Sequence, residues 1–279
     1  MNAADASCLS TFRLRPAAAL QPYVDRIWGW ESAAGQAIAL PTLLPGTGAE
    51  VFFHYRAPFC RSNPQGPALL PPAHLLCVRG APLALRAATD VGFVAVRFRA
   101  GMLHRFVRIP AQELLDQACA VDALWGAAAA ELAERIGCAV SFAERAALVQ
   151  SFLLSRLRSS QGDDLAEQAV SMLYRAGAEL SVARLAEHLG IGRRQLERRV
   201  KLWTGQTPAE VRRLVRFQKT VRALMLDPSA RCADAALAHG YYDQAHFIHD
   251  FRELAQATPQ RYVDAARARA HFYNTPWRP

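Results

Sequence analysis

The strongest constraint on this chain is a helical pattern that occurs twice in its C-terminal part. The first copy spans residues 181–208 and reads SVARLAEHLGIGRRQLERRVKLWTGQTP, and the second spans 232–259 and reads CADAALAHGYYDQAHFIHDFRELAQATP. In each copy an Ala stands four residues before a Gly, which permits the positive φ of a tight turn between two closely crossing helices. The pattern predicts two helix-turn-helix units, each with a second helix that can enter a DNA major groove.

The second helix of each unit is amphipathic. Spacings of four and then three place the apolar side chains on one side of a helix: Leu196, Val200 and Trp203 in the first copy, and Phe247, Phe251 and Leu254 in the second. The opposite side of the first helix presents Arg193, Arg194, Glu197, Arg198 and Lys201, and that of the second presents Gln244, Ala245, Ile248 and His249. These two outward faces are the candidate DNA-reading surfaces.

The basic charge of the chain is concentrated in the same part. The formal net charge is +9, and residues 193–222 contain ten basic side chains against only Glu197 and Glu210. A basic run alone is as often a solvated helix face, but its coincidence with the helix-turn-helix pattern favours binding to the phosphate backbone of DNA. The candidates for phosphate contact are Arg193, Lys201, Arg212, Arg213, Arg216 and Lys219.

One long helix is predicted between the two units. Thr207 is a suitable N-cap, Pro208 suits the first helical position, and Glu210 completes a capping box. The helix is expected to stop at Asp227-Pro228, because proline cannot continue it. Such a helix is a rigid rod that fixes the distance between the two reading helices.

The N-terminal part has a different character. Runs at 51–55 and 91–98 are rich in β-branched and aromatic residues between Gly and Pro breaks, which predicts a small barrel or sandwich. Helices are expected near 111–118, 121–136 and 141–158, the last with an apolar stripe that suits packing on the β-structure or self-association. We therefore expect an α+β regulatory domain at 1–160, a polar linker at 159–163 and an all-α DNA-binding domain at 164–265.

Other classes of protein find little support. No apolar run is long enough to span a bilayer and no leader is evident, so a cytoplasmic protein without membrane contact is expected. A cupin-like metalloenzyme is conceivable from Glu50, His54, His74 and His104, but these histidines are too widely spaced for a typical ligand set. No catalytic motif, cofactor loop or clustered cysteine pattern is present, and neither a metal nor a cofactor is expected.

The C-terminal residues resemble the AraC/XylS family of transcription regulators across roughly 164–265. The resemblance lies in the two Ala-x3-Gly turns, the two Thr-Pro endings, the basic linker helix, and the run from Gly240 to Phe251, which is close to the family's second-repeat signature. It implies base contacts by Arg194, Glu197 and Arg198, with Arg able to recognise guanine and Glu able to accept from cytosine. Glu197 also has an alternative, an ion pair with Arg193 or Lys201 at helical spacing. A weaker similarity, carried by 44–52 and 96–101, relates the N-terminal part to a sensor-like domain of the family.

The chain departs from the family pattern at four positions. Tyr241 replaces a usual Phe, which is tolerable if its hydroxyl reaches solvent or a partner. Gln256 stands where a Gly is usual, and Gly192 replaces the usual Ser N-cap. His249 replaces a common Arg, so one DNA contact is expected to be weaker and sensitive to pH.

The reading that emerges is a promoter-binding transcription regulator. The second helix of each unit would enter successive major grooves, with an effector or partner acting on the N-terminal domain. A homodimer formed through that domain and contact with RNA polymerase are further expectations. An architectural DNA-binding protein without effector is the alternative, although Trp28, Trp30, Phe52, His54, Phe93 and Arg97 are available to line a cavity or to form plain core.

Overall fold

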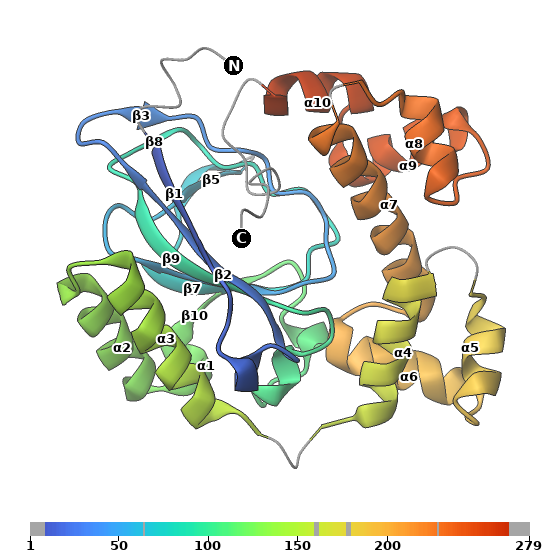
Figure 1. Ribbon diagram of the computed structural model, residues 1–279, viewed down its shortest axis with the longest axis horizontal. Helices are drawn as coiled ribbons and strands as arrows, with labels where there is room; N and C mark the ends of the chain where they lie inside the picture. Colours follow the sequence, from blue (N-terminus) through green and yellow to red (C-terminus); the bar gives the residue numbers. More distant parts are fainter. Residues whose placement is uncertain (1–8, 64, 159–161, 177–179, 228, 268–279) are drawn as a thin grey trace.

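The computed structural model describes residues 9–63, 65–158, 162–176, 180–227 and 229–267. A β-rich part and a helical part lie side by side (Figure 1). The strands are β1 (Leu9–Leu14), β2 (Val24–Ser32), β3 (Ala37–Ile38), β4 (Glu50–His54), β5 (Cys60–Asn63), β6 (Gly66–Leu69), β7 (Ala73–Leu76), β8 (Ala88–Thr89), β9 (Gly92–Phe98) and β10 (Ala118–Ala120). The main sheet has the antiparallel order β1-β2-β9-β4-β7-β10, and β3-β8 and β5-β6 form two small ribbons.

The alternation of side chains along these strands separates two cores. Helices α1 (Val121–Trp125), α2 (Ala127–Cys138) and α3 (Phe142–Arg156) pack on one face, where Val51, Val94 and Val96 are buried with Leu132 and Val149. The other face forms a second core of aromatic side chains, in which Trp28, Phe52 and Phe93 make edge-to-face contacts. The prediction of an α+β N-terminal fold is confirmed.

Two details of the helical prediction were wrong. The segment near 111–118 forms only a short 3₁₀ turn at Ala111–Glu113, and Ala118–Ala120 then pairs with β7 instead of continuing a helix. Asp116 has a φ of +58°, which breaks the helical path between them. The expected helix at 121–136 is divided at Gly126, whose φ of +67° ends α1 and begins α2.

The C-terminal part is entirely helical within the described residues. Its helices are α4 (Asp164–Ala176), α5 (Val182–His188), α6 (Arg193–Thr204), α7 (Pro208–Leu226), α8 (Cys232–Ala238), α9 (Gln244–Ala255) and α10 (Pro259–Arg267). The capping box predicted at the start of α7 is present, with the Thr207 side chain accepting from the Glu210 N–H and the Glu210 carboxylate accepting from the Thr207 N–H. Asp227 ends α7, and Pro228 lies outside the described residues. No described helix combines the length and apolar character that crossing a membrane needs.

The long helix α7 belongs to two hydrophobic cores. Val211 and Val215 are buried with residues of α4, α5 and α6, whereas Phe217 and Val221 are buried with residues of α8, α9 and α10. Figure 1 shows the α5–α6 pair and the α8–α9 pair near opposite ends of α7. The rod predicted from the sequence therefore holds both helical pairs in place.

The β-rich and helical parts also pack against each other. Leu44 is buried in the core formed by α7, α8 and α9. The Gln218 amide lies against Gly46, where an added Cβ would come within 2.4 Å of its nitrogen. Arg105 donates hydrogen bonds to Asp164 and Glu167 at the start of α4, at 2.8 and 2.6 Å. The domain boundary expected at 160 falls in 159–161, which lie outside the described residues.

The backbone of Gln256 has a left-handed conformation, and its cost in free energy can be tested by substitution. Gln256 ends α9 with a φ of +53°, and its equivalent at the end of α6 is Gly205, with a φ of +73°. Because a side chain in this left-handed conformation costs roughly 1 kcal/mol, Gln256→Gly should raise the free energy of unfolding by about 0.5–1 kcal/mol. Urea titration measures the change. Gln256→Ala keeps the Cβ and is the control, and an equal gain from both variants would contradict this explanation.

Candidate nucleic-acid interface

The turns of the two units are built from the same backbone hydrogen bonds. The Ile191 N–H donates to the Ala186 carbonyl at 3.1 Å, and the Tyr241 N–H donates to the Ala236 carbonyl at 3.0 Å. The intervening glycines, Gly190 and Gly240, have φ of +63° and +85°. Both alanines are buried, which lets the helices of each pair cross closely. The sequence prediction of two equivalent helix-turn-helix units is confirmed.

Helix α6 presents a basic surface to solvent. Leu196 and Val200 are fully buried on its inner side. On its outer side, Arg194, Arg198 and Lys201 are exposed. Trp203 departs from the expected apolar face, because it is only half-buried and lies against His104 of the β-rich part, with ring centroids 4.9 Å apart.

The sequence predicts two alternative roles for Glu197, a contact with a base or an ion pair. In the structure the Arg193 Nε donates to the Glu197 carboxylate at 2.9 Å, which is the ion pair predicted at helical spacing. Arg193 is 69% exposed in this pair, which makes it a weak one in solvent. Such a pair can open at little cost when another partner approaches either side chain.

Helix α9 presents a smaller and less basic surface. Gln244, Ala245 and His249 are exposed, whereas Ile248 is half-buried. The Asp243 side chain caps the helix by accepting from the His246 N–H at 2.7 Å. The imidazole of His249 lies 3.7 Å from the Glu253 carboxylate, a distance that gives it an acidic neighbour.

Sequence reasoning missed one exposed side chain beside α9. Tyr242, in the turn before the helix, is 87% exposed. Because Tyr242 lies directly before α9, it joins the outward side chains of this helix as a candidate contact residue. The only sequence signal was a second aromatic residue directly after Tyr241.

The cations of the α7 face have partners within the protein. Arg213 forms ion pairs with Asp250 and Glu253 of α9, and Arg216 lies 3.4 Å from Asp250. The Lys219 ammonium donates to the Tyr174 carbonyl at 2.8 Å, and Arg212 donates to the Leu180 carbonyl at 3.2 Å. These contacts fasten α7 to α9, to α4 and to the residues just before α5. Phosphate contact by these side chains stays a prediction, and each now has an observed structural role.

Asp250 is the centre of the contact between α7 and α9. Its buried carboxylate accepts the Tyr241 hydroxyl at 2.7 Å as well as the Arg213 and Arg216 guanidinium groups. Burial and the nearby Asp250 charge raise the pKa of the Tyr241 hydroxyl. The Arg216 guanidinium also covers the Tyr241 ring, 4.1 Å from its centroid. Tyr at this position is thus accommodated because its hydroxyl has a partner.

The histidines considered for a metal site do not form one cluster. Antiparallel pairing of β4 with β7 brings the His54 and His74 rings to 5.5 Å inside the aromatic core, despite their separation in sequence. Burial lowers the pKa of His54 to about 3 and that of His74 to about 4, so both are neutral near pH 7. His104 lies elsewhere, 2.8 Å from Glu167. Among the described residues, no three His, Cys, Asp or Glu side chains are grouped to hold a metal ion.

Two matching helix-turn-helix units, one with an arginine-rich outer helix, define a DNA-binding protein. Residues 185–265 match the family model described as a helix-turn-helix domain. Residues 12–120 match a model described as a domain of unknown function. The chain therefore contains a C-terminal helix-turn-helix domain, a kind of domain that binds DNA.

Several solved structures are similar to this chain. An AraC-type transcriptional regulator from Chromobacterium violaceum is 28% identical, with a TM-score of 0.34 over 36% of this chain and 90% of its own. The DNA-binding domain of AdpA, solved with a target DNA, is 24% identical, with a TM-score of 0.34 over 38% of this chain and 96% of its own. ToxT from Vibrio cholerae is 13% identical, with a TM-score of 0.47 over 92% of this chain and 98% of its own. No curated protein sequence matches the chain.

The carboxylate of Asp250 should contribute far more to the free energy of unfolding than the carboxylate of Glu253. Asp250→Asn leaves two guanidinium groups without their buried counter-charge, so we expect a loss of about 3 kcal/mol in the free energy of unfolding. Glu253→Gln removes a half-exposed carboxylate from the same cluster and should cost under about 1 kcal/mol. Guanidinium chloride titration of both variants measures the difference. Similar losses in the two variants would show that Asp250 is not the centre of this contact.

Proposed function

We propose that this protein regulates transcription by placing α6 and α9 in successive major grooves on one side of promoter DNA. The observation that carries the proposal is the pair of matching turns held on one rod, with an exposed Arg-rich face on α6. Because both pairs pack on α7, their separation is fixed before DNA is met. A preformed spacing of this kind favours binding to two sites about one helical turn apart.

The outward residues divide by their chemistry into readers and anchors. On α6, Arg194 and Arg198 can each form paired hydrogen bonds with guanine, and Glu197 can accept from cytosine once it leaves Arg193. On α9, Gln244 suits adenine, whereas Ala245 and Ile248 suit thymine methyl groups. His249 of α9 is a further candidate for base contact, and Arg193 and Lys201 are assigned to phosphates. We assign Arg212, Arg213, Arg216 and Lys219 first to the frame that holds α7, and to phosphate contact only where DNA approaches them.

The N-terminal domain is proposed to supply control and self-association. It packs directly on α4 and α7, so a change in it reaches the helices that carry the DNA-binding units. Self-association through this domain stays part of the proposal, with the outer helices α1, α2 and α3 as its candidate surface. Contact with RNA polymerase at the promoter, action in the cytoplasm and absence of enzymatic activity complete the proposal.

Substitutions on α6 can separate base reading from charge. Arg194→Ala should remove one guanine preference, equivalent to about 1–3 kcal/mol, at a single position of the selected site. Lys201→Ala should instead weaken binding to all sequences alike and reduce the salt dependence by about one phosphate contact. Selection of binding sites from random DNA, followed by fluorescence anisotropy at several salt concentrations, measures both effects.

The matched control is Arg86→Ala, because Arg86 is exposed on the β-rich part and belongs to neither DNA-binding unit. It should leave the affinity and the selected sequence unchanged. If Arg194→Ala selects the same sequence as the unaltered protein, then Arg194 is not a reader and the orientation assigned to α6 is wrong.

A further inference from the structure

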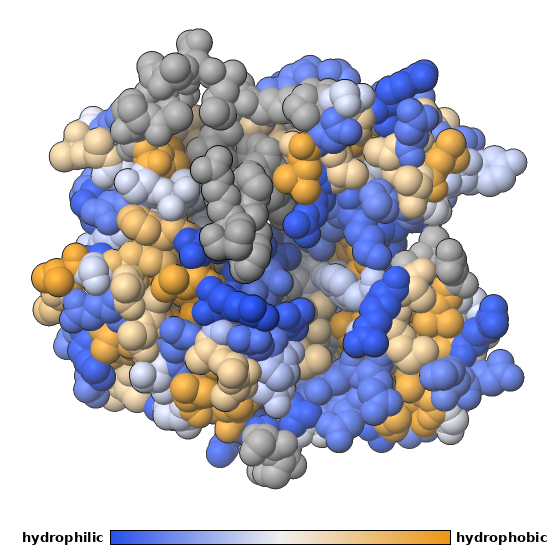
Figure 2. Space-filling model, in the orientation of Figure 1, coloured by the Kyte–Doolittle hydropathy of each residue, from blue (hydrophilic) through white to orange (hydrophobic). Residues whose placement is uncertain are grey.

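A cavity of about 840 Å³ lies between the β-rich part and the helical part. Strands β1, β2 and β9 form one wall, and helices α4 and α7 form the other. Figure 2 shows hydrophilic residues gathered along the seam between the two parts on this face. Contacts between the parts flank the space, with Gln218 against Gly46 and Val170 against Gly101. The cavity is thus bounded by both domains rather than enclosed within either one.

The lining of this cavity is strongly basic. Its cationic side chains come from both domains and are Arg13, Arg26, Arg97, Arg99, Arg175, Lys219 and Arg222. Among the lining residues that the structure describes, Asp25 carries the only carboxylate. Like charges gathered around one partly desolvated space repel each other unless counter-charges enter it.

The strand registers explain why the cations gather at the wall formed by β1, β2 and β9. Arg26 pairs with Arg97, and Arg97 pairs with Glu50, so three charged residues stand side by side on β2, β9 and β4. Arg13 of β1 is opposite Trp28 and therefore lies on the same face as Arg26. Two carboxylates serve these guanidinium groups: the buried Glu50, 3.3 Å from Arg97, and Asp25, which forms an ion pair with Arg26 at 3.2 Å.

The ionisation of this group is consistent with an excess of positive charge. Burial and the neighbouring Arg97 charge lower the pKa of Arg26 to about 10. Burial alone would raise the pKa of Glu50, but the Arg97, Arg26 and Arg79 charges outweigh it and hold that pKa below its usual value. Arg79 is itself buried, and within the described structure its Nε and Nη1 have no hydrogen-bond partner.

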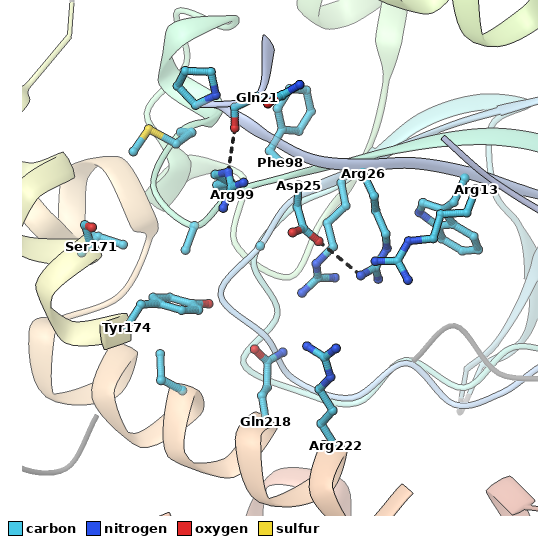
Figure 3. A pocket seen from close by; sticks show the side chains of 18 of the residues that line it. Arg13, Gln21, Asp25, Arg26, Phe98, Arg99, Ser171, Tyr174, Gln218 and Arg222 are labelled. Carbon is cyan, nitrogen blue, oxygen red and sulfur yellow. Dashed lines mark hydrogen bonds and ion pairs between the residues drawn. The ribbon is translucent and has the colours of Figure 1, made fainter. Parts of the chain in front are cut away.

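The helical wall adds a cation, Arg222, that points toward the strands of the opposite wall. Figure 3 shows Gln218 and Arg222 extending from α7 toward Asp25, Arg26 and Arg13. Tyr174 extends into the same space from α4. Arg175 of α4 lines the same space. A negative group placed here would meet guanidinium groups from both walls.

The remaining lining favours an organic ligand over a bare inorganic ion. Apolar and aromatic side chains occupy much of the wall, among them Trp28, Trp30, Phe98, Met102, Val170 and Val215. A space of this size is typical of sites for small molecules, in which apolar walls hold the body of the ligand and a few polar groups orient it.

We propose that this cavity binds a small organic anion with at least two negative charges, carried by carboxylate or phosphate groups. Arg13 and Arg26 on the barrel side and Arg222 on α7 hold the anionic groups, and the aromatic wall holds the body. Forked guanidinium groups are well suited to paired hydrogen bonds with either kind of oxyanion. The bound ligand joins α7 to the β-rich part and fixes the orientation of both DNA-binding units relative to that part. This regulatory consequence rests on the proposed function, whereas the binding of the anion does not.

The test is isothermal titration calorimetry on the full chain at low salt and without DNA. The probes are naphthalene-1,4-dicarboxylate, inorganic pyrophosphate, and the neutral naphthalene-1,4-dimethanol. We expect at least one dianion to bind and the neutral compound not to bind. A preference for the dicarboxylate indicates an organic acid as the natural ligand, and a preference for pyrophosphate indicates a phosphorylated one.

Two substitutions test the site from opposite walls. Arg222→Met and Arg13→Met should each raise the Kd for the anion by about tenfold or more, because each removes a charged hydrogen-bond donor. Arg86→Met removes an equal charge from the exposed surface of the β-rich part and should leave the Kd unchanged. Circular dichroism establishes that each variant is folded.

Three results would overturn the proposal. One is the absence of binding by both dianions at millimolar concentration. A second is equal weakening by Arg86→Met, which would show general attraction to a basic surface. The third is a combination of two results: the unaltered protein binds neither anion, and Arg222→Met loses affinity for DNA. This would assign the cavity cations to DNA phosphates. A protein that binds the anion but no DNA would disprove the proposed function and leave this site intact.

Discussion

The arrangement of this protein depends on one helix being shared by two hydrophobic cores. Val211 and Val215 of α7 are buried with the first helix-turn-helix unit, and Phe217 and Val221 are buried with the second. Neither unit can move relative to α7 without exposing large apolar side chains, at a cost of about 25 cal/mol for each Å² exposed. The ion pairs of Arg213 and Arg216 with Asp250 add a directional contact to this non-directional one. The distance between the reading helices is therefore a property of the folded domain.

The same helix also faces the N-terminal domain. Gln218 and Arg222 lie on the side of α7 toward the β-rich part, whereas Phe217 and Val221 face the second unit. A helical period of 3.6 residues separates these roles on neighbouring positions. Both units pack on this helix, so its contact with the β-rich part is a contact with the element that they share. This gives an N-terminal event a physical route to DNA binding that does not require either unit to unfold.

Much of the C-terminal domain could be predicted from the sequence because its signals are local. The Ala-x3-Gly turns, the Thr207 capping box and the apolar faces are each set by neighbouring residues, and they appear in the structure with the exception of Trp203, which is only half-buried. The partners of Arg213, Lys219 and Arg212 could not be predicted, because they are reached only when distant elements pack together. The proximity of His54 and His74, and the gathering of Arg26 with Arg97, depend in the same way on strand pairing. The helix expected near 111–118 failed for a related reason, since pairing with β7 overrode a favourable helical composition.

The most direct test of this account is a hydroxyl-radical footprint of the protein on its selected DNA site. The account predicts two protected windows on one face of the duplex, with centres about 10 base pairs apart, for each bound chain. Their separation should stay constant when the sequence between them is changed, because α7 sets it. A single protected window, or two windows whose separation varies with the DNA sequence, would contradict the claim that α7 holds both reading helices at a fixed spacing.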